Sequence, residues 1–458
     1  MPELNRSKLA ELLKSEEQRF HQTHPKSYEL YQRARTSLHG GVPMLWMIRW
    51  AGSFPVFVKE AKGVHFTDVD DNSYIDLCLG DTGAMTGHSP DATVHAIQEQ
   101  IQKGITLMLP YEDVIWVGEE LQRRFGLPYW QFALTATDAN RFALRMARMI
   151  TERPKILVFN YCYHGSVDES FIVFDEEGTP MSRPNNMGPQ IDPLYTSKVI
   201  EFNDIAALET VLSARDVAAV LAEPVMTNIG IIHPEPGYHD ALRELTRKYG
   251  TYLIVDETHT ICTGPGGYTA AFGLQPDFLT IGKPLAGGVP AAVYGFTEDI
   301  AQAFSERLDL DDADVGGIGG TLAGNALSIA AIKATLQNVL TDEFYIKAIA
   351  LQECFTEGVE SVIKEFDLPW IVKRLGNRSE YWFRPIPPKN GGEAFAALDH
   401  ELDRYMHLFA LNRGILMTSF HNMALISPDI TKEDVDYHTK VFREAVSSLF
   451  GKRSSEIG

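Results

Sequence analysis

The chain has 458 residues, 45% hydrophobic and 22% charged, a composition typical of a globular protein large enough for two or three hydrophobic cores. Its 61 acidic and 41 basic residues give a net charge of −20, which argues against binding to a nucleic-acid phosphate backbone or to an anionic membrane. The four cysteines lie far apart and include no CxxC pair, so we expect neither a zinc site nor a disulfide framework.

The N-terminal twenty residues carry charges throughout and place apolar residues at helical spacing, which predicts a helix. They lack the apolar core of a secretion signal, and no apolar run in the chain is long enough to span a membrane. We therefore expect a cytosolic protein. Residues 63–80 then predict a β-hairpin, because two β-rich runs flank the turn residues Asp70, Asp71 and Asn72.

From about residue 90 to 335, short apolar runs alternate with segments of helical length. This alternation predicts an α/β fold with a mostly parallel sheet that is covered by helices on both faces. In such sheets, ligands bind at the carboxyl ends of the strands. The predicted strands are 131–134, 155–159, 217–223, 251–256, 278–281 and 291–296.

The C-terminal part of the sequence has a different pattern. A long helix at 342–365, a strand at 379–384 and a closing helix from Lys432 predict a smaller α+β domain. We expect the N-terminal segment to join this domain. The predicted organisation is therefore an N-terminal segment of the small domain (1–85), a large domain (86–335) and a C-terminal small domain (336–458).

Asp256 and Lys283 are the most informative residues of the large domain. One strand-like run ends in Asp256, and a second leads to a Gly-Lys pair beside further glycines. This layout suits a cofactor that requires one carboxylate and one amine. The alternative is that Asp256 is a turn or capping residue and that Lys283 is an ordinary solvated lysine.

Several motifs in this region together resemble the class III aminotransferases, a family of fold-type I pyridoxal-phosphate enzymes. The similarity runs from HGGVP (39–43) to SPDITKEDVD (427–436) and is greatest to glutamate semialdehyde aminomutase and to amine and β-amino-acid transaminases. It implies pyridoxal 5'-phosphate as cofactor, a large domain with a mostly parallel sheet, and a small domain formed by both termini. It also implies a homodimer with active sites at the subunit interface.

The resemblance assigns roles around the cofactor ring. Lys283, in a Gly-Lys-x-x-x-Gly-Gly setting, would form the Schiff base with the cofactor and later move a proton. Asp256 would pair with the pyridine nitrogen and keep the ring electron-withdrawing. Tyr163, with His164 beside it, would stack on one ring face, and the methyl group of Thr258 would pack on the other.

Further roles concern the phosphate and the ring hydroxyl. Thr135, Ala136 and Thr137 stand where the family has its phosphate cup, at a helix N-terminus that favours anions. A plain Thr/Asp helix cap is the alternative here. Thr321 resembles the threonine that reaches the phosphate in the neighbouring subunit, although its Gly-rich surroundings also suit a flexible loop.

Two more residues match the family's cofactor contacts. Glu223 lies in a Glu-Pro segment that closes over the cofactor, and Asn228 resembles the asparagine that contacts the ring hydroxyl. Glu223 could instead be a solvated carboxylate at a strand end. The stretch DETHT lacks the second histidine of a metalloprotease motif, so we expect no metal site.

The family's carboxylate-binding arginine is missing from its usual place. In GGVPMLWMIRWAGSFP (40–55), ungapped counting places Trp46 or Met47 there, with Arg49 two or three residues away. Either Arg49 substitutes through a shifted register, or the pocket is apolar and accepts amines or long-chain substrates. Further candidates are Trp50 and Trp382 for the pocket, and Arg378 and Arg384 as carboxylate anchors.

From these motifs we expect a pyridoxal-phosphate aminotransferase that works by a ping-pong mechanism. It would move an amino group from an amine or amino-acid donor to a keto-acid or ketone acceptor. One alternative is a 2,1-aminomutase of the glutamate semialdehyde type, which the sequence separates poorly from a transferase because the half-reactions are shared. A protein that keeps the fold but has lost the chemistry is the other.

Overall fold

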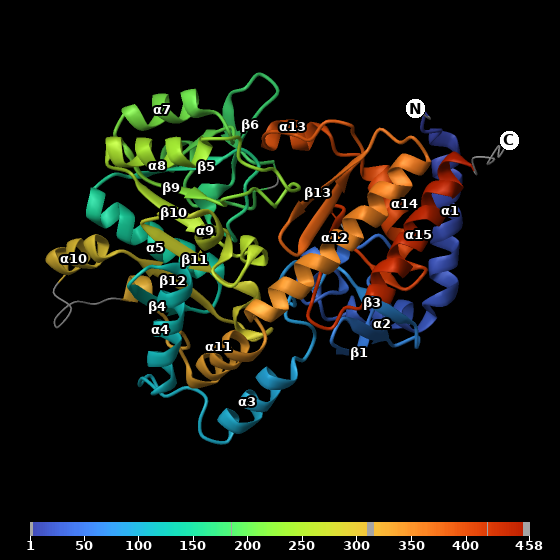
Figure 1. The fold of residues 1–458 in the computed structure, drawn as a ribbon, viewed down its shortest axis with the longest axis horizontal. Coiled ribbons are helices and arrows are strands. Elements are labelled where there is room, and N and C mark those ends of the chain that lie inside the picture. Colours follow the sequence, from blue (N-terminus) through green and yellow to red (C-terminus); the bar gives the residue numbers. More distant parts are fainter. Residues whose placement is uncertain (1–2, 185, 309–315, 419, 452–458) are drawn as a thin grey trace. The chain divides into compact units, whose positions relative to one another are not determined.

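The computed structural model describes residues 3–184, 186–308, 316–418 and 420–451 (Figure 1). The chain forms two compact units. Both chain termini belong to unit 1, and the middle of the chain forms unit 2. Unit 1 comprises Met1–Pro90, Ile346–Pro387 and Ala397–Gly458, and unit 2 comprises Asp91–Tyr345 and Pro388–Ala396.

Unit 2 contains a seven-stranded sheet with the order β4-β12-β11-β10-β9-β5-β8. β12 runs antiparallel to both of its neighbours, and the other pairs of adjacent strands are parallel, so the predicted mostly parallel sheet is confirmed. Every residue of β9, β11 and β12 is buried, so both faces of the sheet are covered at these strands. The strands are β4 (Tyr129–Ala133), β5 (Lys155–Phe159), β8 (Ser197–Ile200), β9 (Val217–Ala222), β10 (Tyr252–Asp256), β11 (Phe278–Ile281) and β12 (Ala292–Phe296).

Helices and a small hairpin complete unit 2. The helices are α3 (Asp91–Ile101), α4 (Asp113–Phe125), α5 (Ala136–Thr151), α6 (Pro193–Thr196), α7 (Ile205–Ser213), α8 (Tyr238–Tyr249), α9 (Gly267–Phe272), α10 (Glu298–Arg307), α11 (Ala326–Asn338) and α13 (Gly391–Ala396). Short 3₁₀ turns are η3 (Asp168–Ser170), η4 (Thr260–Thr263), η5 (Lys283–Ala286) and η6 (Gly316–Ile318), and the hairpin pairs β6 (Ile172–Phe174) with β7 (Pro180–Ser182).

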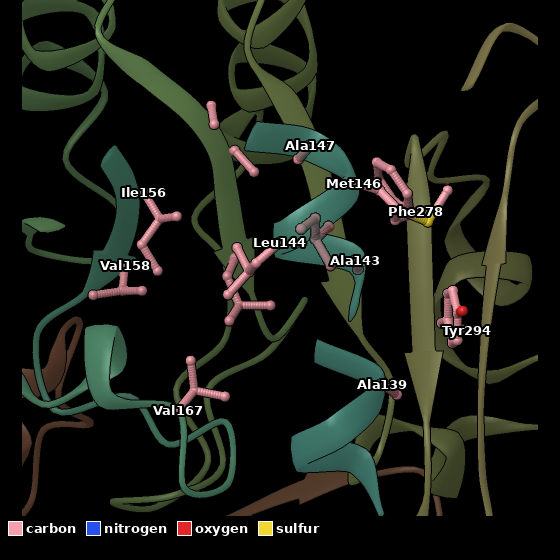
Figure 2. Close-up of a cluster of buried hydrophobic side chains, with 14 of the residues drawn as sticks. Ala139, Ala143, Leu144, Met146, Ala147, Ile156, Val158, Val167, Phe278 and Tyr294 are labelled. Atoms are coloured by element: carbon pink, nitrogen blue, oxygen red, sulfur yellow. The ribbon is translucent and has the colours of Figure 1, made fainter. Parts of the chain in front are cut away.

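Helix α5 lies across the sheet and carries much of its core. Ala139, Ala143 and Ala147 recur every fourth residue on one helix face and are fully buried. Figure 2 shows these small residues facing the strands, with Ile156 of β5 to one side and Phe278 of β11 to the other. Because alanine has a small side chain, the helix backbone approaches the sheet closely. This packing fixes where the N-terminus of α5 lies at the sheet edge.

Unit 1 contains a four-stranded sheet, β1-β2-β3-β15, and a three-stranded sheet, β13-β14-β16. The hairpin β2–β3 is antiparallel, as predicted. Because β15 pairs with β3, the N-terminal and C-terminal parts of the chain form one α+β unit, which confirms a small domain formed by both termini. The elements are α1 (Arg6–Thr23), α2 (Pro25–Ala34), η1 (His39–Gly41), η2 (Leu45–Ile48), β1 (Val58–Lys62), β2 (His65–Asp68), β3 (Ser73–Asp76), β13 (Ile371–Leu375), β14 (Arg378–Trp382), α14 (His400–Leu411), β15 (Ile415–Leu416), β16 (Met423–Leu425) and α15 (Lys432–Phe450).

The predicted long helix is α12 (Asp342–Glu365), which begins in unit 2 and continues into unit 1. Throughout the part of the chain that the structure describes, no helix has the length and apolar character needed to span a membrane.

Candidate active site

The candidate site lies at the carboxyl ends of two adjacent parallel strands of unit 2. Strands β10 and β11 pair in a register that sets Asp256 beside Thr280. Lys283 follows Thr280 by three residues and begins the turn η5. Asp256 and Lys283 are therefore both presented at the sheet edge where parallel sheets bind their ligands.

Asp256 is a buried carboxylate with an organised set of hydrogen-bond donors. Its Oδ2 accepts hydrogen bonds from Asn140 Nδ2 and His164 Nδ1, each at 2.9 Å, and its Oδ1 accepts one from the Thr258 backbone N–H at 3.1 Å. A carboxylate offers about four acceptor positions, so one position on Oδ1 remains for a further donor. Burial raises the pKa of Asp256, but the hydrogen bond and charge of His164 outweigh burial and lower it to about 2. Asp256 is therefore ionised at neutral pH.

Asn140 completes this arrangement, and sequence reasoning missed it. Its Nδ2 also donates to the His164 carbonyl at 3.2 Å, and its Oδ1 accepts from the Thr280 hydroxyl at 2.7 Å. Asn140 is fully buried on the sheet-facing side of α5, next to Ala139. A polar residue on the apolar face of a predicted helix was the signal that could have identified it.

Lys283 is half-buried and has a left-handed backbone conformation, with φ of +45°. Non-glycine residues seldom adopt this conformation, which is concentrated at functional sites. Its Nζ lies 2.7 Å from His259 Nε2. The preceding residue is in close contact with α5, because a Cβ added to Gly282 would lie 3.0 Å from the Ala136 Cβ. The lysine backbone is thus packed against the N-terminus of α5.

Thr135, Ala136 and Thr137 lie at this N-terminus, as predicted. Thr135 is the N-cap: its hydroxyl accepts from the Asp138 backbone N–H at 3.2 Å and donates to the Asp138 carboxylate at 2.9 Å. This is the Thr/Asp cap that the sequence offered as an alternative. The first backbone N–H groups of the helix have no intrahelical acceptor, so those of Ala136 and Thr137 can serve an anion, and the helix dipole favours one there.

The loop that carries Tyr163 and His164 is tied to α5. The Ser166 backbone N–H donates to Thr137 Oγ1 at 3.0 Å. Gly165 permits this contact, because a Cβ there would lie 2.1 Å from Thr137 Oγ1, and its φ of +78° also favours glycine. His164 is buried, whereas Tyr163 is 41% exposed, and its ring lies edge-on to that of Phe171 with the ring centroids 6.3 Å apart.

Glu223 and Asn228 form hydrogen bonds with neighbouring loop residues in this structure. The Glu223 carboxylate, buried just after β9, accepts hydrogen bonds from the backbone and hydroxyl of Thr227. Burial raises the pKa of Glu223. Asn228 Nδ2 donates to the Tyr161 carbonyl at 2.9 Å and so supports the loop that leads to Tyr163. Glu223 also interacts with the charges of His164 and Asp256. The roles of Glu223 and Asn228 toward a cofactor remain predictions.

The arrangement fits pyridoxal phosphate. Asp256 has a remaining acceptor position for the ring N–H, Lys283 supplies the amine, and the N-terminus of α5 can hold the phosphate. Two buried polar atoms, His164 Nε2 and Thr258 Oγ1, have no hydrogen-bond partner within the described chain. Such atoms are uncommon in native structures and are consistent with a bound polar group. Within the same part of the chain, no group of three or more His, Cys, Asp and Glu residues could hold a metal ion.

The remaining predicted residues lie elsewhere in the chain. Thr321 is exposed in unit 2. Trp46, Met47 and Arg49 belong to unit 1 and are all exposed, and the Trp46 ring lies 4.2 Å from that of Phe420. No contact here assigns these four residues a role, so their roles remain predictions.

The other candidates for the substrate pocket also lie in unit 1. Arg378 is fully buried there, with Nη1 at 3.8 Å from Asp81 and 3.4 Å from the Thr82 hydroxyl. Trp382 is buried, whereas Trp50 and Arg384 are half-buried.

Comparisons with known proteins agree with this site. Residues 47–446 match the family model for class-III aminotransferases. A glutamate-1-semialdehyde 2,1-aminomutase from Sorangium cellulosum (strain So ce56) is 32% identical over 93% of this chain and 97% of its own length. The crystal structure of a glutamate-1-semialdehyde-aminomutase from Pseudomonas aeruginosa PAO1 is 46% identical, with a TM-score of 0.96 over 97% of this chain and 99% of that one.

A variant of the Pseudomonas protein was solved in complex with PMP at the same level of similarity. An omega-transaminase from Sphaerobacter thermophilus is 26% identical, with a TM-score of 0.85 over 92% of this chain and 97% of that one. The chain therefore belongs to the class-III aminotransferase family, which comprises pyridoxal-phosphate enzymes of fold type I.

Proposed function

We propose that this protein is an amino-group-transferring enzyme of the 2,1-aminomutase type, which moves an amino group between neighbouring carbons of one substrate. The observation that carries the proposal is the placement of Asp256 and Lys283 just at or after the carboxyl ends of two adjacent strands. The choice of an aminomutase is supported by relatives of that name, which are similar over nearly the whole chain. The sequence had favoured intermolecular transfer, and these comparisons favour its alternative.

When bound, pyridoxal phosphate supplies an aldehyde and a ring that accepts electrons. The residues of this chain would hold it and move protons. Asp256 would keep a proton on the ring nitrogen, since its carboxylate is ionised and has an acceptor position left. The N–H groups of Ala136 and Thr137 would hold the phosphate. Lys283 Nζ would attach to the aldehyde and later carry a proton between substrate and cofactor carbons.

The proposal includes a homodimer whose subunits complete each other's sites, with Thr321 reaching the partner's phosphate. Two features of unit 2 support it. Thr321 is exposed, and so is the apolar run Leu107, Met108 and Leu109, with exposed fractions of 58%, 75% and 68%. Exposed apolar patches mark interaction surfaces. Sedimentation of the protein is expected to give twice the chain mass, and Met108→Glu to shift it toward the monomer.

The test of an aminomutase is whether one substrate is converted without a partner. The protein loaded with pyridoxal phosphate is incubated with glutamate 1-semialdehyde and no keto acid. We expect the isomer with the amine on C1 and the carbonyl on C2, and no dependence on an added acceptor. Lys283→Ala is the control and should lower turnover by about 10²–10⁴-fold, because the proton carrier is gone. Release of a dicarbonyl product that has lost its amino group, with further turnover only when a keto acid is added, would contradict the aminomutase and favour a transferase.

A transaminase is the second candidate, and unit 1 offers a specific observation in its favour. The segment from Met44 to Ile48 exposes five large apolar side chains. By ungapped counting, Trp46 or Met47 stands where the family resemblance implies a carboxylate-binding arginine. This pattern suits donors without a carboxylate. A panel of alkyl amines, arylalkyl amines and amino acids, tested with pyruvate and with 2-oxoglutarate, decides this point. A strict requirement for a donor carboxylate would contradict an apolar pocket.

The catalytic proposal has its own test. The purified protein should show visible absorbance after addition of pyridoxal phosphate, and borohydride should bleach it. Lys283→Ala should show no such covalent chromophore. A wild-type chain that stays colourless with excess cofactor would instead support a protein that keeps the fold without the chemistry.

A further inference from the structure

We propose that His259 is a positioning residue for Lys283: its neutral imidazole accepts a hydrogen bond from Nζ and holds the amine in one place at the carboxyl end of β11. This inference rests on the proposed function, in which Lys283 is the amine that attaches to the cofactor. His259 follows Asp256 by three residues, so one strand end would supply both the carboxylate for the ring and the partner of the lysine.

The contact between the two side chains is close. Lys283 Nζ and His259 Nε2 lie 2.7 Å apart, at the short end of the range for a hydrogen bond from nitrogen. A lysine has four rotatable bonds, and ordering them costs conformational entropy. A partner at the tip of the side chain therefore selects one rotamer from many. The position of this amine matters, because a misplacement of about 1 Å at a reacting group can lower the rate on the order of 100-fold.

The backbone of His259 is itself held from both sides. Glu257, two residues earlier, is fully buried, and its carboxylate accepts hydrogen bonds from the Thr260 hydroxyl and the Tyr268 backbone N–H. The Glu257 carbonyl also accepts from the Ile261 N–H at 2.9 Å, which closes a turn around His259. The imidazole is thus mounted on a rigid loop, as a positioning residue requires.

The direction of the hydrogen bond follows from the chemistry of the two groups. A lysine ammonium has three donors and no acceptor, so the imidazole nitrogen facing it must carry a lone pair. At neutral pH a lysine is ordinarily charged and a histidine ordinarily neutral, which suits this arrangement. In acid both groups would be cations, and their repulsion would break the contact. The positioning should therefore weaken as the pH falls.

The segments that build the candidate site carry other ionisable groups. Each of the carboxylates among them accepts a hydrogen bond from another residue. They are Asp256 with His164, Glu257 with Thr260, Glu223 with Thr227, and Asp138 with Thr135.

The first experiment uses the cofactor-free protein and does not depend on activity. Histidine ring signals of the labelled chain are followed by NMR from pH 5 to 9, and His259→Gln identifies the signal of His259. We expect Lys283→Met to raise the titration midpoint of this signal by at least about one pH unit, because a neighbouring cation disfavours the imidazolium. Lys333→Met is the control, since that lysine is bonded to Asp113 on other helices. An unchanged midpoint in Lys283→Met would overturn the proposal.

The second experiment measures how fast the protein takes up pyridoxal phosphate, from the rise of visible absorbance at several pH values. His259→Leu should slow uptake by about 10–100-fold, because the amine loses the hydrogen bond that holds it in position. The amine must lose a proton before it attacks the aldehyde, so uptake declines in acid in every variant. His259→Gln keeps an acceptor that does not titrate, so it should restore most of the rate and decline less steeply in acid than wild type. Equal rates in all three proteins, or an acid decline in His259→Gln as steep as in wild type, would overturn the proposal.

The two experiments also separate this inference from the proposed function. A wild-type protein that takes up no cofactor would defeat the proposed function, whereas the NMR titration would still decide whether Lys283 and His259 are paired. Circular dichroism of His259→Leu shows whether that variant folds. If it does not, His259→Gln and the NMR titration still decide the outcome.

Discussion

Asn140 is the residue through which the architecture around Asp256 can be tested most directly. Its amide nitrogen donates to Asp256 at 2.9 Å, and it is fully buried. Asn140→Asp changes almost no volume and keeps the oxygen that accepts from Thr280. It replaces the donor with a second carboxyl group at hydrogen-bond distance from Asp256. Asn140→Leu is the matched variant, because it removes the same hydrogen bonds without adding a titratable group.

The magnitude follows from the separation of the two groups. Two unit charges about 3 Å apart repel by about 5 kcal/mol at an effective dielectric constant of about 20. This energy corresponds to a rise of about 4 units in the pKa at which the pair loses its last proton, to about 8. Below that pH the protonated carboxyl group of Asn140→Asp can still donate to Asp256. Above it the variant buries two negative charges side by side.

The sign of the pH dependence is therefore fixed. The folded-state pKa of the new carboxyl group lies above its value of about 3.9 in the unfolded chain, so stability is retained below about pH 4 and lost as the pH rises. Between pH 5 and pH 8 we expect Asn140→Asp to lose about 4 kcal/mol relative to wild type. Asn140→Leu should lose about 3–5 kcal/mol at both pH values, from three missing hydrogen bonds.

The assay is thermal unfolding of the cofactor-free protein by circular dichroism, with each variant compared with wild type at the same pH. For a unit of this size, about 4 kcal/mol corresponds to a shift of roughly 8–16 °C in the melting temperature. Comparison at equal pH removes the pH dependence of every other group. If the gap between Asn140→Asp and wild type is the same at pH 5 and pH 8, the two carboxyl groups do not share a proton and the described contact is wrong.

Three further predictions test other parts of the molecule. Burial raises the pKa of Asp403 to about 7, so this carboxyl group destabilises the fold as the pH rises from about 4 to 7. Asp403→Asn should therefore stabilise the protein by up to about 4 kcal/mol at pH 8 and by little at pH 4. Thermal unfolding at the two pH values measures this difference. Gly165→Ala should lower the free energy of unfolding by about 1–3 kcal/mol more than Gly178→Ala does. Both glycines have a φ near +78°, but only an alanine at position 165 would clash with Thr137. Equal melting temperatures of the two variants would refute this. Asp256→Asn should retain bound cofactor, seen as visible absorbance, yet turn over about 10²–10³-fold more slowly, and wild-type turnover would exclude an electrostatic role for the carboxylate.

Much of the fold was predictable because its signals are local. The run KILVF became β5 (Lys155–Phe159), and the runs ending at Asp256 and at Ile281 became β10 and β11. A fully buried strand must be apolar along its whole length, so a single segment reveals it. Strand β8 (Ser197–Ile200) was not predicted, because its sequence SKVI is short and half polar.

Strand direction and the course of the chain were harder to predict. The antiparallel orientation of β12 (Ala292–Phe296) depends on its neighbours in the sheet, and its own sequence looks like that of any buried strand. The segment Pro388–Ala396, which the sequence placed in the C-terminal domain, clusters with unit 2. It does so through contacts such as that of Gly391, where an added Cβ would lie 1.9 Å from the Asn160 carbonyl oxygen.

The sequence by itself determined where the strands lie and that Asp256 and Lys283 stand at two strand ends, because burial periodicity and chain order are local properties. Only the tertiary structure decided which side chains those two residues meet. Asn140 reaches Asp256 across 116 residues of sequence, and His259 reaches Lys283 across 24. Hydrogen bonds are short and directional, so their partners are chosen by the packing of α5 and the loops after β10 and β11, which no single segment of the sequence specifies.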